Sequence, residues 1–159
     1  MKKVILSGIF VAVTIFNVQA QNQEVTPQYE VKVITSVESI VPSGLGRSRL
    51  ISANADRDFE EFTSQRTEEN NTRNKAKRKN IRVKDFEETK LLNFFNLGGI
   101  RFQNIASNDA IISSKLTQML SEGWDLSFVV SGVESKGGDG DEFGIYITRY
   151  IFKRPKSQK

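Results

Sequence analysis

The chain contains no cysteine and no histidine among its 159 residues. Without cysteine it has no disulfide, no lipid-bearing thiol and no thiol nucleophile, and without histidine it has no Ser-His-Asp triad and no imidazole base. Zinc, copper and haem also lose their usual ligands, so we expect neither a metal nor a cofactor. Carboxylates, lysines, tyrosines and hydroxyls remain as catalytic groups, which makes an enzyme the less favoured class.

The first twenty residues have the pattern of a secretory signal peptide. Lys2 and Lys3 form a positive start, residues 4–13 are uncharged and apolar, and Ala20 ends a cleavage site. The apolar run is shorter than the roughly 20 residues that span a bilayer, and no later stretch could span one. We therefore expect removal of residues 1–20, which lowers the formal net charge from +4 to +2, and a periplasmic or secreted bacterial protein.

After a flexible N-terminus at 21–28, residues 29–159 are expected to form a single domain. Its first element is a strand beginning at Tyr29, because apolar and polar residues alternate there with a period of two. One side holds Tyr29, Val31, Val33, Thr35 and Val37, and the other holds charged and polar residues. The alternation predicts a strand with one buried face.

The main helix is predicted over about 108–122, after an extended segment at 100–105. Residues 107–109 supply capping side chains, apolar residues then recur at helical spacing, and Gly123 suits the left-handed conformation that ends a helix. Trp124 begins the next strand and is expected to pack in the core. Gly123 and Trp124 are therefore assigned structural roles.

The remaining elements complete an α+β fold. Strands are predicted from Trp124 and from Phe143, joined by a glycine-rich loop at 136–141 that favours a turn over a calcium site. The order predicts a small antiparallel sheet with the main helix packed on one face and a C-terminal hairpin. Residues 87–97 fit a helix and a buried strand almost equally well, and both remain open.

Residues near 56–86 form a charged insertion that we expect to be disordered, because it is too polar to bury a core of its own. Its second half carries seven cations in twelve residues and no acid. The cluster consists of Arg73, Lys75, Lys77, Arg78, Lys79, Arg82 and Lys84. It suits an anionic polymer, although a solvated charge run balanced by nearby glutamates is the alternative.

A basic glycine loop follows the first strand. Gly44, Gly46, Arg47 and Arg49 could hold an anion through backbone N–H groups and guanidinium groups. The loop lacks the spacing and the Lys-Ser/Thr pair of a nucleotide-binding P-loop, however. A tight turn is the favoured interpretation, and anion binding is the alternative.

Three segments of the chain resemble a family of small bacterial domains, the domain of unknown function 4177. They are Tyr29-Glu-Val-Lys-Val33, the passage into Gly123-Trp124-Asp125-Leu126, and Tyr150 to Pro155. Val31 and Asp125 depart from the common pattern of that family, and residues 41–107 have no counterpart in it. The resemblance implies a fold alone, because the family has no agreed activity, so it assigns no functional residues.

These observations favour a non-catalytic binding or scaffolding domain of the bacterial cell envelope. Its expected partners are an envelope protein or an anionic polymer. The alternative is a small carboxylate-dependent hydrolase that acts on envelope glycans, with Glu122 and Asp125 beside Trp124 as the acids to inspect.

Overall fold

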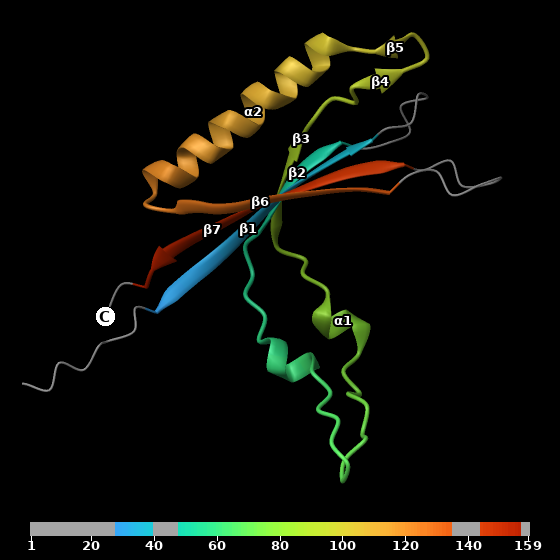
Figure 1. Cartoon of the computed structure of the whole chain (residues 1–159), viewed down its shortest axis with the longest axis vertical. Helices are drawn as coiled ribbons and strands as arrows, with labels where there is room; N and C mark the ends of the chain where they lie inside the picture. The colour runs from blue at the N-terminus through green and yellow to red at the C-terminus, as the bar shows by residue number, and fades with distance from the viewer. Residues whose placement is uncertain (1–27, 40–47, 135–143, 157–159) are drawn as a thin grey trace, which may run out of the picture.

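The computed structural model describes residues 28–39, 48–134 and 144–156. They form a five-stranded antiparallel sheet with one long helix across one face (Figure 1), which confirms the predicted α+β class and C-terminal hairpin. From edge to edge the strands are β3 (Phe86–Lys90), β2 (Arg49–Ala53), β1 (Tyr29–Ser39), β7 (Ile145–Pro155) and β6 (Asp125–Glu134). The predicted signal peptide at 1–20, the flexible segment at 21–27 and the loop at 136–141 lie outside the described residues.

The long helix α2 covers Phe102–Ser121 and therefore starts earlier than the predicted residue 108. The prediction of an extended segment at 100–105 is right for Ile100 and Arg101 and wrong for residues 102–105, which are helical. The residue before the helix is Arg101, whose side chain makes no capping hydrogen bond. The polar residues that suggest a cap lie inside the helix, where Ser107 Oγ donates to the carbonyl of Gln103 and Asn108 is buried. Such side chains favour caps in general, but tertiary contacts override that preference here.

The C-terminus of α2 is a Schellman motif. Gly123 has a φ of +81°, a left-handed conformation that glycine adopts without steric cost. The N–H of Trp124 donates to the carbonyl of Met119, and the N–H of Gly123 donates to the carbonyl of Leu120, both at 3.1 Å. The motif turns the chain into β6 and places the Trp124 ring in the core, with the guanidinium carbon of Arg154 4.3 Å from the ring centroid.

The core lies between α2 and the sheet. Its buried apolar members are Ile34, Leu50, Leu91, Ile112, Met119, Trp124 and Phe152. Ile112 and Met119 are two helical turns apart and so project from the same side of α2. Buried serines and Thr148 also lie in the interior. Their hydroxyl groups need hydrogen-bond partners there.

The alternation in β1 is present, but α2 covers its mostly polar side. Ile34 is fully buried under the helix, and Lys32 and Ser36 lie on the same side of the strand. The neighbouring strand supplies much of the apolar material there, because Phe152 pairs with Lys32 and Tyr150 with Ile34. The valines of β1 face the opposite side of the sheet.

Residues 86–101 connect the sheet to α2 without a helix of their own. After β3 comes a short hairpin of β4 (Phe95–Asn96) and β5 (Gly99–Ile100). The open question at 87–97 is therefore answered by strands and not by a helix, with irregular residues at 91–94. The expected burial of the strand is wrong, because β3 is exposed along its whole length.

The charged insertion, which we call the arm and define as residues 54–85, leaves the sheet between β2 and β3 (Figure 1). It contains a 3-10 helix, η1 (Phe59–Phe62), and one helical turn, α1 (Arg78–Ile81). The N–H of Asn54 donates to the carbonyl of Asp85 at 3.2 Å and closes its base. The amide of Asn74 donates to the carbonyls of Glu61 and Thr63 and connects its two halves. The expected disorder of this insertion stays a prediction.

One side chain fastens α2 to the segment before it. Asn108 is 1 % exposed, and its Oδ1 accepts from the N–H of Leu92 at 2.8 Å while its Nδ2 donates to the carbonyl of Leu92 at 2.7 Å. Leu91 beside this clamp is a member of the core. The two hydrogen bonds therefore fix the position of residues 91–94 relative to α2.

Asn108→Ala should lower the free energy of unfolding by about 2–6 kcal/mol, because it leaves two backbone groups without partners at about 1–3 kcal/mol each. Urea unfolding followed by circular dichroism measures the change. Gln103→Ala, at an exposed position of the same helix, is the matched control and should stay within about 0.5 kcal/mol of the parent. Equal effects of the two substitutions would contradict the clamp.

Candidate functional site

Within residues 28–39, 48–134 and 144–156, the most extensive uncovered feature is the face of the sheet opposite α2, which we call the open face. Register places Val33 of β1 opposite Ile151 of β7, and Ile151 opposite Phe128 of β6, all on this face. Val31 is 64 % exposed and Phe128 66 % exposed. The apolar side chains of the open face are Tyr29, Val31, Val33, Val37, Ile51, Phe86, Phe128, Val130, Ile145, Ile147 and Ile151.

Charged side chains border this apolar area, and one lies within it. Arg149 of β7 lies between Thr35 of β1 and Val130 of β6 on the open face. Lys153 lies nearer one end of the same strand, with Nζ 5.5 Å from the centroid of the Tyr29 ring. At the other end of the sheet, Arg49 pairs with Glu88 across β2 and β3. Apolar side chains around a central arginine suit a protein–protein interface, because arginine and aromatic residues are enriched in such interfaces.

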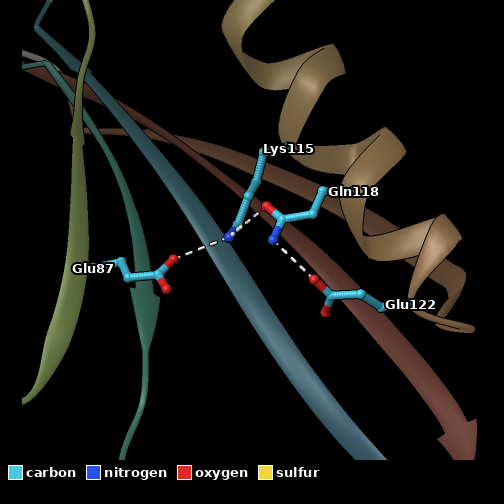
Figure 2. Close-up of polar contacts among 4 residues, drawn as sticks. All are labelled: Glu87, Lys115, Gln118 and Glu122. Atoms are coloured by element: carbon cyan, nitrogen blue, oxygen red, sulfur yellow. Dashed lines mark hydrogen bonds and ion pairs between the residues drawn. The ribbon is translucent and has the colours of Figure 1, made fainter.

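A groove of about 510 Å³ runs between α2 and strands β2 and β3. Lys115 Nζ donates to Glu87 at 2.9 Å and to Gln118 at 3.2 Å, and Gln118 Nε2 donates to Glu122 at 2.8 Å (Figure 2). The hydrogen bond and the charge of Lys115 lower the pKa of Glu87. A general acid needs a raised pKa, so this groove contains an ion-paired carboxylate that is unsuited to that role.

The two carboxylates considered for hydrolysis, Glu122 and Asp125, are both exposed. Glu122 accepts from Gln118, and Asp125 lies opposite Lys153 in the pairing of β6 with β7. Neither lines the groove beside α2 or the cleft of about 690 Å³ next to the start of β1. Within the described residues, these two pockets therefore give the pair no cleft in which to act.

A second acidic position lies at the other end of the helix-covered face. Burial raises the pKa of Glu38, and the nearby carboxylate of Asp109 on α2 raises it further. Tyr146 pairs with Glu38 in the ladder, and the neighbouring Tyr150 also has a raised pKa, chiefly because it is buried. No set of three acidic residues that could hold a metal ion occurs in the part of the chain that the structure describes.

The arm presents the predicted basic cluster without acidic partners. All seven cations from Arg73 to Lys84 are exposed. None of them takes part in the ion pairs formed among residues 28–39, 48–134 and 144–156. Glu60 and Glu61 lie on the outgoing half of the arm, but they do not pair with these cations. The alternative, in which nearby glutamates balance these cations, is therefore supported by no ion pair among the described residues.

The predicted glycine loop can be assessed at Arg49 alone, because Gly44, Gly46 and Arg47 lie outside the described residues. Arg49 belongs to β2, where its guanidinium contacts the carboxylate of Glu88 and donates to the carbonyl of Ser48 at 2.7 Å. An arginine held this way has fewer N–H donors available for an external anion.

Sequence reasoning did not identify the open face as a candidate site. The sequence feature that could have identified it is the last strand, which is apolar on both sides: Ile147 and Ile151 alternate with Tyr150 and Phe152. A chain with a single long helix covers one side of its sheet, so a strand that is apolar on both sides indicates an uncovered apolar surface.

Comparison with protein-family models, with curated proteins and with solved structures finds no match for this chain. No helix within residues 28–39, 48–134 and 144–156 combines the length and apolarity needed to cross a membrane. The geometry of the described residues is therefore the basis for any functional assignment.

The environments of Glu38 and Glu87 predict opposite effects of pH on stability. A raised folded-state pKa contributes stability that is present below the unfolded value of 4.5 and lost as the pH rises through the folded pKa. A lowered folded-state pKa contributes stability that is present above 4.5 and lost as the pH falls through the folded pKa.

Glu38→Gln should therefore stabilise the protein at neutral pH, with the gain disappearing toward about pH 4. Glu87→Gln is the matched control and should destabilise at neutral pH, with the loss shrinking in acid. Urea unfolding of both variants at about pH 4 and about pH 7 measures the differences. If both substitutions changed the free energy of unfolding at neutral pH in the same direction, the predicted pKa shifts would be contradicted.

Proposed function

We propose that the protein is a non-catalytic binding domain of the bacterial cell envelope that docks on another protein through its open face. The single observation that supports this is the uncovered apolar side of the sheet. Strands β1, β7 and β6 are 11, 11 and 10 residues long. At about 3.3 Å per residue and about 4.8 Å between strands, these three strands alone present roughly 500 Å².

Apolar side chains supply the larger part of this area, which Arg149 and Lys153 interrupt, and exposed apolar surface of this kind indicates binding. Contiguous apolar patches larger than a few hundred Å² are rare on soluble monomers and mark interaction sites when they occur. Each fully buried valine or phenylalanine contributes about 1.5–3 kcal/mol, so covering Val31, Val33 and Phe128 would supply a substantial driving force. The placement in the envelope rests on the signal-peptide pattern of residues 1–20.

A photo-crosslinking residue at Val33, near the centre of the open face, tests this function in the cell that makes the protein. The matched position is Thr117, which is exposed on α2. We expect a discrete adduct from position 33 and none from position 117, and Val31→Lys in the same chain should abolish it. Equal labelling of both positions, or an adduct of twice the chain mass, would contradict docking on a different protein.

A second function, attachment to an anionic polymer, is favoured by the seven unpaired cations of the arm. Clustered cations bind polyanions through summed attraction and release of counterions, and the strength falls steeply with salt. The arm leaves the sheet between β2 and β3 and runs away from it (Figure 1), so the backbone that carries the basic cluster is separate from the sheet. One molecule could therefore hold a protein and a polymer together, which is the action of a scaffold.

Heparin chromatography tests the arm. Substituting glutamine for Arg73, Lys75 and Lys77 should lower the salt concentration at which the protein elutes, because the contiguous cluster is broken. The control carries the same loss of charge at scattered exposed positions, Lys90, Arg101 and Lys156, and should elute near the parent. Equal shifts would show that net charge alone governs retention and would remove the arm as a binding element.

A further inference from the structure

The two edges of the sheet are protected very differently. Strand β3 carries Glu87, Glu88 and Lys90 within five residues, and such charges keep an edge from pairing with another sheet. Strand β6 has no charged residue and no proline between Leu126 and Val133. In the part of the chain that the structure describes, β6 pairs with β7 alone, so it presents a long apolar edge without these safeguards.

Both sides of β6 are uncovered as well as its edge. On the open face Val130 is 55 % exposed, and on the helix side Val129 is 53 % and Val133 62 % exposed. The helix contacts β6, but the buried core residues that the sheet strands supply beneath α2 are Ile34, Leu50 and Phe152, from β1, β2 and β7, and none belongs to β6. The helix therefore leaves the side chains of β6 to be covered by something else.

A bulge defines which part of this edge can pair. The register between β6 and β7 shifts between Leu126 and Phe128, and from Phe128 to Glu134 it is regular. Bulges bend a strand and interrupt its ladder. The regular seven-residue stretch from Phe128 to Glu134 is the segment available to another strand.

We propose that β6 pairs antiparallel with β6 of a second copy of this chain, about a two-fold axis at Ser131. A continuous sheet requires opposed residues to lie on the same side, so an antiparallel self-pairing has its axis on a residue. Ser131 is the centre of the regular stretch, and an axis there uses all seven residues. An axis at Val130 would leave a shorter ladder because it would run into the bulge.

The central residues that this register brings together fit one another, while the end pair places Phe128 opposite the partner's Glu134. Val129 lies opposite the partner's Val133 on the helix side, a pair of β-branched residues of the kind that stabilises sheets. Val130 lies opposite the partner's Gly132 on the open face, so a large and a small side chain alternate there. Ser131 meets its own copy.

The length of the paired segment also indicates how stable the dimer should be. Seven residues make a ladder of about 23 Å, and an interface of that extent falls in the small, transient class. The dimer should therefore dissociate on dilution. It would place two open faces on one continuous sheet, and it stands independently of what those faces bind.

Single cysteines test the register cleanly, because the chain has none of its own. Under mild oxidation, Ser131→Cys in the full-length chain should form a disulfide-linked dimer, since directly opposed residues lie about 4.5–5.5 Å apart at Cα and a disulfide tolerates that distance. Glu88→Cys, at the centre of the other edge strand, should stay monomeric. Cross-linking of Val130→Cys in place of Ser131→Cys would overturn the register, and cross-linking of neither would overturn the pairing.

The mass of the unmodified chain in solution provides the second measurement. Light scattering after gel filtration should show a mass that rises with concentration toward twice that of the chain. Val130→Lys, which adds the charge that edges normally carry, should abolish the rise, whereas Val31→Lys, on the same face at a comparably exposed position, should not. A constant monomer mass, growth beyond the dimer, or equal effects of the two lysines would overturn the proposal.

Discussion

The two hydrogen bonds between Asn108 and the backbone of Leu92 hold the rest of this structure in place. Residues 91–94 form neither helix nor strand, so their polar groups need partners from elsewhere. The Asn108 amide satisfies both groups of Leu92 and keeps Leu91 in the core. A second polar contact, from Ser48 Oγ to Asn93 at 2.7 Å, connects the same segment to the start of β2. Helix and sheet are thus joined through a side chain with strict geometry, in a core with few large apolar members.

The fold class could be predicted from sequence because its signals are local. Gly123 ends α2 through its own backbone conformation, and the alternation in β1 directly reflects a strand. The start of α2 could not be predicted from sequence, since Asn108 and Ser107 resemble capping residues until their hydrogen-bond partners are known. The open face was also hidden, because alternation shows that a strand has two different sides but not which side receives the helix. That choice depends on Phe152 and Tyr150, which are more than a hundred residues away.

Coverage of the sheet is uneven, and this unevenness links the proposals. In the part of the chain that the structure describes, α2 shields the middle of one face, while the opposite face and strand β6 stay uncovered. Exposed apolar surface costs solubility and carries a risk of aggregation, so such surfaces need partners. The open face and the β6 edge meet at Val130, and a partner on one could alter access to the other. The basic arm leaves the sheet at its other end, between β2 and β3.

The hydrogen bond between Asn54 and Asp85 has a consequence for how this protein can change over generations. It joins the two ends of the arm where they leave the sheet. The pairing of β2 with β3 therefore does not depend on the length of the arm. Loop closure becomes less favourable only slowly with length, by about 0.6 kcal/mol for each doubling. Insertions, deletions and changes of charge can therefore accumulate in the arm while the domain remains intact. The length and charge of the arm can therefore vary with little effect on the stability of the sheet.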